Sequence, residues 1–192
     1  MVDTQITEGL MTIDEFIEAF DKQPFEIING EKRIVSPNVA GHVMFAANIM
    51  WALLSFVKPQ RLGEVYTEAP FVLMDARQWV KGSRIPDVMY VSAENLARFM
   101  TSVNDPKHKP FVLVPEIVVE IISPTDKYTE VSEKVDAYLN DGVLLVWVAD
   151  LRTKTIKVHQ PDKLPFTLRG EDKLTGGEVI PGFEVIVSSL FE

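Results

Sequence analysis

Apolar residues recur with helical spacing in two segments before residue 60. The segment 13–20 follows Thr12 and has Glu15 at the third position after that threonine, which is typical of a capped helix start. Over residues 39–57, apolar side chains recur at intervals of three and four along two rows. We therefore predict a second helix there, buried on most sides. The two rows are Val43, Ala47, Met50, Leu54 and Val57, and Phe45, Ile49, Leu53 and Phe56.

Shorter runs with strand-like composition occupy much of the remaining chain. Two such runs flank Asn29-Gly30, the dipeptide most typical of a tight β-hairpin. Residues 64–74 and 84–92 are predicted as strands, separated by a polar turn over 75–83. The run 115–123 carries apolar residues on both faces, which predicts a central strand of a sheet.

A helix over about 127–140 is predicted directly after this central strand. Ser123 or Thr125 is its expected cap, and Gly142 is placed to end it. Buried strands, an outer strand and Gly/Pro turns follow. This order predicts a mixed β-sheet flanked by helices, an α/β (α+β) fold.

The composition is that of one ordinary globular domain. Of the 192 residues, 46% are hydrophobic and 24% are charged, and no repeat or linker divides the chain. The absence of cysteine excludes disulfides, thiolate zinc sites and a cysteine nucleophile. The longest apolar run, Val43 to Val57, is shorter than the ~18–20 residues of a membrane span. No signal-peptide pattern is present, so a cytoplasmic location is expected.

Three ionisable residues fall where the hydrophobic pattern predicts interior positions. Glu120 lies among isoleucines and valines of the central strand, either exposed at the strand end, paired with a lysine, or aimed at a ligand. Lys134 lies in the apolar row of the following helix, although a surface pair with Glu130 is the alternative. Asp87 follows Pro86 early in a strand, where ordinary turn chemistry is the alternative.

Two carboxylates from neighbouring strand ends and a lysine suit a hydrolase that uses Mg²⁺ or Mn²⁺. Carboxylates and water are the ligands that hard cations prefer. The cation lowers the pKa of bound water and offsets charge on a phosphate, while a lysine can orient the water or neutralise an oxyanion.

The chain resembles the Uma-type restriction endonucleases of the PD-(D/E)XK nuclease superfamily. The resemblance rests on the order and spacing of "PDVMYVS", "PEIVVEIISPTDKYTEVSEKVDAYLNDGV" and "VWVAD". It implies one restriction-endonuclease-like domain over 1–192, with a helix and hairpin over 1–37, the nuclease core over 38–160 and a β extension over 161–192. It also implies that Asp87 and Glu120 hold Mg²⁺ (or Mn²⁺), that Lys134 assists the attacking water, and that DNA is the substrate.

One position departs from the superfamily pattern. The superfamily has a lysine two residues after the acid, where this chain has Ile122. Lys134 on the next helix is the expected substitute. A further catalytic acid is also expected; Glu31 is the candidate, with Glu26 and Glu64 as alternatives.

Other conspicuous side chains have mainly structural interpretations. His42 is expected either to line the cleft or to serve the structure, and Asp150 is interpreted as a turn acid. Trp51, Trp147 and Tyr138 occupy positions that favour core packing over base stacking.

Three functions are compatible with these observations. The first is a Mg²⁺-dependent endonuclease acting on DNA, for which the resemblance also implies a homodimer. The second is a catalytically inactive binding or assembly module, favoured by the net charge of −9 and by Ile122. The third is hydrolysis of a small phosphoester. Clustering of four lysines beside Asp87 would distinguish the first function from the third. They are Lys81, Lys107, Lys109 and Lys127.

Overall fold

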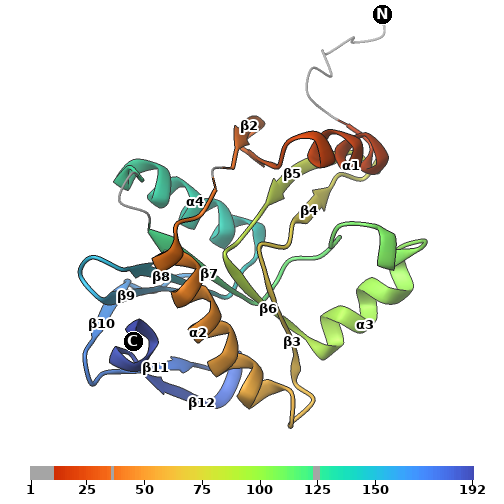
Figure 1. Cartoon of the computed structure of the whole chain (residues 1–192). Helices are drawn as coiled ribbons and strands as arrows, with labels where there is room; N and C mark the ends of the chain where they lie inside the picture. Colours follow the sequence, from red (N-terminus) through yellow and green to blue (C-terminus); the bar gives the residue numbers. More distant parts are fainter. Residues whose placement is uncertain (1–10, 36, 123–125) are drawn as a thin grey trace, which may run out of the picture.

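The computed structural model describes residues 11–35, 37–122 and 126–192, and Figure 1 shows the arrangement of their helices and strands. The helices are α1 (Ile13–Lys22), α2 (Ala40–Val57), α3 (Ala93–Ser102) and α4 (Tyr128–Asp141), with short 3-10 turns η1 (Pro106–His108) and η2 (Ser188–Phe191). The strands are β1 (Phe25–Ile28), β2 (Glu31–Ile34), β3 (Gly63–Thr67), β4 (Phe71–Met74), β5 (Val80–Arg84), β6 (Val88–Ser92), β7 (Ile117–Ile122), β8 (Leu145–Asp150), β9 (Thr155–His159), β10 (Phe166–Arg169), β11 (Lys173–Gly176) and β12 (Ile180–Ile186).

These strands form two larger sheets and one hairpin. The order in the six-stranded sheet is β10-β9-β8-β7-β6-β3, and the order in the four-stranded sheet is β2-β1-β5-β4. Strands β7 and β8 are parallel, with α4 between them in the chain, whereas β6 and β9 run antiparallel to their neighbours. The sheet is therefore mixed, as predicted. The hairpin β1-β2 turns at Asn29-Gly30, where both residues have positive φ angles.

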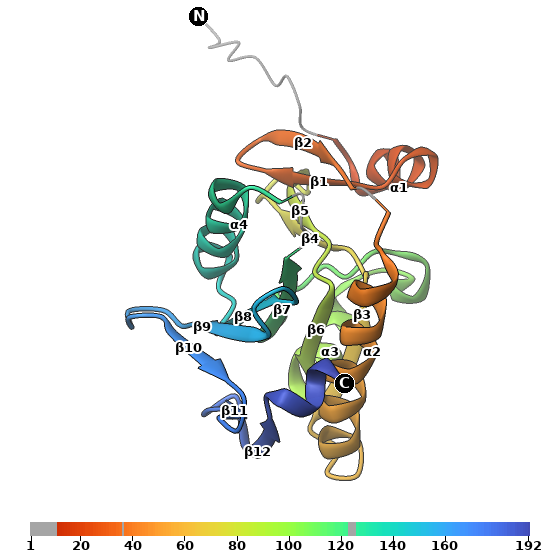
Figure 2. The same cartoon turned by 60° about the vertical axis from the view of Figure 1, so that its left-hand side comes forward.

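Helices cover both faces of the six-stranded sheet (Figure 2). On one face, Ile49 and Leu53 of α2 pack around Trp147 with the C-terminal hairpin and η2. On the other face, Tyr138 of α4 packs in one core with Met89 of β6 and with apolar residues of α3. The four-stranded sheet has its own core around Phe16 of α1. The apolar residues on both faces of β7 thus form two separate cores, which confirms β7 as a central strand.

Several predicted helix ends are present. Thr12 and Glu15 form a capping box at the start of α1. Gly142 follows α4 with φ 106°, a left-handed conformation that suits glycine. The expected caps Ser123 and Thr125 lie outside the described residues.

The predicted polar turn over 75–83 is wrong, because Val80–Arg84 is strand β5. Its polar residues bond to the neighbouring strand: Ser83 Oγ accepts from the Ile27 amide at 2.9 Å, and the Arg84 guanidinium donates to the Ile27 carbonyl. A composition typical of a turn is therefore compatible with a buried strand here, because these side chains supply backbone partners.

The prediction that α2 is buried on most sides is also wrong. Trp51, expected in the core, is 71% exposed, and Val43 is 51% exposed. Trp147 and Tyr138 are fully buried, as expected. Among the described residues, α2 is the one helix whose length and composition would allow a membrane span, which is weak evidence because core helices share these properties.

Candidate active site

The predicted acids lie where the two larger sheets meet. Asp87 sits in the short segment between β5 of the four-stranded sheet and β6 of the six-stranded sheet. Val88 on β6 pairs with Val119 on β7 in antiparallel register. Asp87 directly precedes Val88 and Glu120 directly follows Val119, so each acid is the chain neighbour of this last pair, and the charge of Asp87 acts on the pKa of Glu120.

Asp87 is held by donors from two elements. Its Oδ2 accepts from the Ile121 amide at 2.6 Å and lies 3.1 Å from Nε2 of His42, in the first turn of α2. Among the described residues, Oδ1 has no donor. Burial alone would lower the pKa of His42, but its hydrogen bond to Asp87 and the charge of that carboxylate raise it. His42 is therefore a partner of the acid and not only a packing residue.

Glu120 is buried and bound at both oxygens. Oε2 lies 2.9 Å from Lys134 Nζ, and Oε1 accepts from the Tyr138 hydroxyl at 2.5 Å. Burial raises the pKa of Glu120 to about 7; Lys134 and the Tyr138 hydrogen bond oppose this rise, whereas the charges of Asp87 and Glu26 add to it. Burial is therefore the main reason that the carboxyl of Glu120 holds its proton more tightly than an exposed glutamate does.

Lys134 reaches the carboxylates from α4. Its Nζ lies 2.9 Å from Glu120 Oε2 and 3.2 Å from Glu26 Oε2. Burial alone would lower the pKa of Lys134, but the two carboxylates raise it above its ordinary value, so the ammonium stays charged. Glu130, the surface partner in the alternative interpretation, pairs instead with Lys127.

Three other acids considered from the sequence lie outside this cluster. Glu31 has a side chain that is 75% exposed and pairs with Arg33 at 3.6 Å. Glu64 pairs with Lys58, and Asp150 accepts from the backbone amides of its own turn, which confirms it as a turn acid. Glu31 thus lies on the solvent-facing side of the hairpin, whereas Glu26 on β1 lies beside Lys134 in the cluster.

Two residues of the cluster, Glu26 and Tyr138, are not among the principal site residues predicted from the sequence. Glu26 was only an alternative, yet it is 6% exposed, and its Oε1 also accepts from the Ile85 amide at 2.9 Å. Tyr138 was assigned to packing alone. Its position one helical turn after Lys134 was the available signal, because residues four apart share a helix face.

Tyr138 is expected to position Glu120. In a Tyr138→Phe variant the carboxylate loses its Oε1 donor, so the free energy of unfolding should fall by about 1–3 kcal/mol. Urea denaturation measures this change, and any divalent-cation affinity should fall in parallel. Tyr128→Phe is the matched control, because Tyr128 is 78% exposed. Equal effects of the two substitutions would contradict the positioning role.

A buried ion pair connects the elements that carry the cluster. Arg84 is 4% exposed, lies 2.8 Å from Asp141 at the end of α4, and donates to the Ile27 carbonyl on β1. It thereby ties β1, which carries Glu26, to α4, which carries Lys134. Because breaking a buried pair leaves an uncompensated charge, this pair fixes the two elements relative to each other.

The donor set fits a hard divalent cation held by few protein ligands. In the described ranges, no three His, Asp or Glu side chains are grouped as a ready-made metal site. Mg²⁺ is commonly bound through one or two carboxylates, with water and phosphate in the other positions. Asp87 and Glu120 supply two such carboxylates, and the charge of Asp87 acts on the pKa of Glu120.

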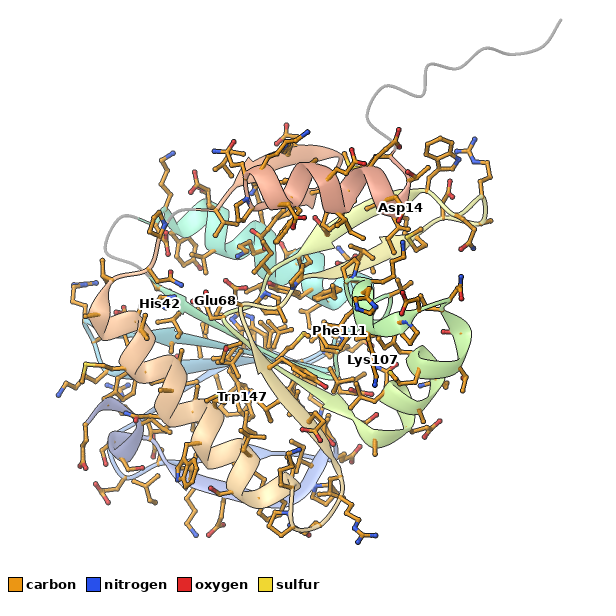
Figure 3. The ribbon with its side chains drawn as sticks, turned by 45° about the vertical axis from the view of Figure 1, so that its right-hand side comes forward. Asp14, His42, Glu68, Lys107, Phe111 and Trp147 are labelled. Carbon is orange, nitrogen blue, oxygen red and sulfur yellow. The ribbon has the colours of Figure 1, made fainter. Side chains whose placement is uncertain are left out.

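Three of the four lysines considered for polyanion binding have surroundings that the structure shows. Lys109 pairs with Asp14, and Lys127 pairs with Glu130. Figure 3 shows Lys107 well away from His42, on the α3 side of the molecule. Lys107 therefore adds no positive charge beside Asp87.

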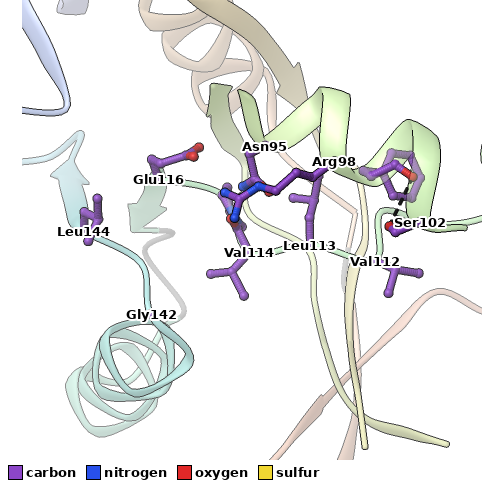
Figure 4. A pocket seen from close by; sticks show the side chains of 11 residues that line it. Asn95, Arg98, Ser102, Val112, Leu113, Val114, Glu116, Gly142 and Leu144 are labelled. Atoms are coloured by element: carbon purple, nitrogen blue, oxygen red, sulfur yellow. Dashed lines mark hydrogen bonds between the residues drawn. The ribbon is translucent and has the colours of Figure 1, made fainter. Parts of the chain in front are cut away.

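A separate pocket of about 540 Å³ lies near α3 (Figure 4). Arg98 and Asn95 of α3 line it, together with Glu116. Glu116 precedes β7, whereas Glu120 lies near the other end of that strand. This pocket is distinct from the carboxylate–lysine cluster.

A family model described as "Uma2: Putative restriction endonuclease" matches residues 13–188. The chain belongs to this family. Membership in the Uma2 family confirms the resemblance seen in the sequence, and it supports a nuclease-like function for the chain.

A solved structure shares the fold of this Uma2 family member. It is the crystal structure of "a putative nuclease belonging to DUF820" from Anabaena variabilis ATCC 29413, with a TM-score of 0.77 and 20% sequence identity. The alignment covers 94% of this chain and 97% of that chain. The predicted restriction-endonuclease-like fold is thus confirmed. The search of curated proteins gave no match.

Proposed function

We propose that the protein is an endonuclease that hydrolyses DNA phosphodiester bonds with Mg²⁺ or Mn²⁺ held by Asp87 and Glu120. The observation that carries this proposal is the neighbouring pair of carboxylates with Lys134 Nζ 2.9 Å from Glu120. Two carboxylates that can bind a hard cation, together with a charged lysine beside them, suit metal-assisted hydrolysis. The family description supports a nuclease, and the roles of the individual residues are our inference.

Each residue has a distinct task in this proposal. Lys134 orients the attacking water and offsets charge that develops on the phosphate. Tyr138 and His42 hold the Glu120 and Asp87 carboxylates, respectively, in fixed orientations. Glu26 keeps the ammonium beside the cluster. The cation, when bound, supplies Lewis-acid activation of water and charge neutralisation.

Hydrolysis of a small phosphoester is the second candidate. It is favoured by the net charge of −9, because polyanion binding relies on clustered Lys and Arg. The same cluster would perform this chemistry. Hydrolysis of a dinucleotide or a bis-aryl phosphate distinguishes the two candidate functions, since these small substrates lack the extended backbone of DNA.

Asp87→Asn is expected to reduce Mn²⁺-dependent nicking of supercoiled plasmid roughly 100-fold or more, because a metal ligand and its charge are lost. Initial nicking rates with excess Mn²⁺ or Mg²⁺ measure the effect. Glu31→Gln, which alters an exposed acid, is the matched control and should keep the wild-type rate.

The outcome of the nicking experiment distinguishes the three candidate functions. Retained nicking in Asp87→Asn would contradict the proposal and indicate a contaminating nuclease. Absence of nicking in the wild-type protein, together with Asp87-dependent hydrolysis of a small phosphodiester, would favour the second candidate. Absence of both activities would favour an inactive binding module.

A further inference from the structure

Arg33 lies at the edge of the carboxylate–lysine cluster, on the hairpin strand next to Glu26. The two residues are direct partners in the β1-β2 register, so their side chains lie on the same face of the hairpin. Glu26 Oε2 lies 3.2 Å from Lys134 Nζ. The Arg33 guanidinium donates to Glu133, which precedes Lys134 in α4, at 2.8 Å. Figures 1 and 2 show the hairpin beside α4, so Arg33 is a second cation next to the cluster.

The charge of Arg33 is more available to a substrate than the charge of Lys134. Lys134 lies between two buried carboxylates of the cluster. The acids beside Arg33 are themselves exposed, since the side chain of Glu133 is 50% exposed and that of Glu31 is 75% exposed. Ion pairs between exposed side chains contribute little in water, so a substrate anion can compete for the guanidinium.

Two of the three guanidinium nitrogens of Arg33 have no acceptor among the residues that the structure describes. Both acidic contacts, 2.8 Å to Glu133 and 3.6 Å to Glu31, are made by Nη2. The N–H groups of Nε and Nη1 remain for another acceptor. A guanidinium matches two oxygens of one phosphate group through such paired donors.

The connection between the hairpin and α4 does not depend on Arg33. Arg84 is 4% exposed and already connects β1 to α4 through its buried pair with Asp141. The exposed pair between Arg33 and Glu133 adds little to that connection. The position of Arg33 beside the cluster is therefore better explained by a ligand than by stability.

We propose that Arg33 binds a phosphate group of the DNA strand next to the phosphate that is cleaved. The assignment rests on the proposed function, because it takes the cluster as the place of hydrolysis. Among the described residues, the acids that contact Arg33 are not those that contact Lys134. Arg33 therefore lies beside the reacting group, where a neighbouring phosphate passes. It supplies a local cation for a polyanion in a chain whose net charge is −9.

Binding of a fluorescent DNA duplex in EDTA tests this contact without requiring hydrolysis. Arg33→Gln should weaken binding roughly 10-fold at low salt and reduce the slope of log affinity against log salt by about 1. Lys32→Gln is the matched control, because Lys32 lies on the opposite face, with Nζ 3.9 Å from the centre of the Phe25 ring. This control should change the affinity by less than about twofold. Arg33→Lys should restore the salt slope but not the full affinity, because lysine lacks the paired donors.

Nicking kinetics with excess Mn²⁺ test where the contacted phosphate lies. Arg33→Gln should raise KM for plasmid roughly 10-fold and leave kcat within about twofold of wild type. Unchanged DNA binding in Arg33→Gln, or equal losses in Arg33→Gln and Lys32→Gln, would overturn the contact. A loss of kcat as large as that of Asp87→Asn would overturn the neighbouring position, because it would place Arg33 at the reacting phosphate. Failure of the proposed function is distinguishable, since the wild-type protein would then not nick DNA at all.

Discussion

Replacing Lys134 by methionine is expected to lower the free energy of unfolding by about 3–5 kcal/mol near pH 8. The side chain is 23% exposed and lies beside both Glu120 and Glu26. Its removal leaves buried carboxylates without their cation, and methionine keeps much of the volume of the stem. The loss should shrink as the pH falls toward 5, because Glu120, whose pKa is about 7, is then protonated and neutral. Nicking activity should disappear as well.

Urea denaturation at pH 8 and pH 5 measures this difference. Lys127→Met is the matched control on the N-terminal side of α4, because Lys127 is 75% exposed and forms only a surface pair with Glu130. That change should shift the free energy of unfolding by less than about 0.5 kcal/mol. Similar losses for both lysines would show that Lys134 does not compensate a buried cluster.

Replacing Glu120 by glutamine is expected to have the opposite effect on stability. The pKa of Glu120 rises from an ordinary 4.5 to about 7 in the folded protein. The folded state therefore binds the proton more tightly than the unfolded state. This contribution to stability is fully present below about pH 4.5 and is lost as the pH rises through about 7. Above that pH, Glu120→Gln should gain stability relative to wild type in the absence of divalent cations, because glutamine stays neutral.

Thermal unfolding from pH 5 to pH 9 tests whether the wild-type protein loses stability relative to Glu120→Gln as the pH rises. The wild-type melting temperature should fall relative to that of Glu120→Gln as the pH rises, and Mn²⁺ should restore it in wild type only. Glu31→Gln should follow the wild-type curve, because Glu31 is exposed. Parallel curves for wild type and Glu120→Gln would contradict the raised pKa. A more stable but inactive variant would show that the cluster serves function at the expense of stability.

The contact between Glu120 and Lys134 was predictable because its causes are local. An acid in a strand that is apolar on both faces, and a lysine on the apolar row of the next helix, meet when that helix packs back on the sheet. Asp87 followed from the same logic at a neighbouring strand. In the proposed function, Lys134 of α4 takes the role of the lysine that is missing at Ile122.

The place of Glu26 in the cluster could not be predicted from local spacing along the chain. It comes from the other sheet, and no spacing rule relates β1 to α4. The one signal was its place between Phe25 and Ile27, the same pattern of an acid in an apolar run that singled out Glu120. Glu31 was chosen for its place after the hairpin turn, but that turn leaves it facing solvent.

The exposure of Trp51 was not predictable from the sequence. Helix α2 is apolar on every side, and composition does not reveal which side the sheet covers. A row of apolar residues predicts contact, but the contact can be with a second chain as well as with the core.

The binding of a cation between the two carboxylates is tested most directly by a crystal structure of the full chain soaked in Mn²⁺, with anomalous data. The account predicts one strong anomalous peak within about 2.2 Å of carboxylate oxygens from both Asp87 and Glu120, and none in Asp87→Asn crystals. A wild-type structure at saturating Mn²⁺ with no peak there, and with Glu120 still bound at both oxygens by Tyr138 and Lys134, would contradict it.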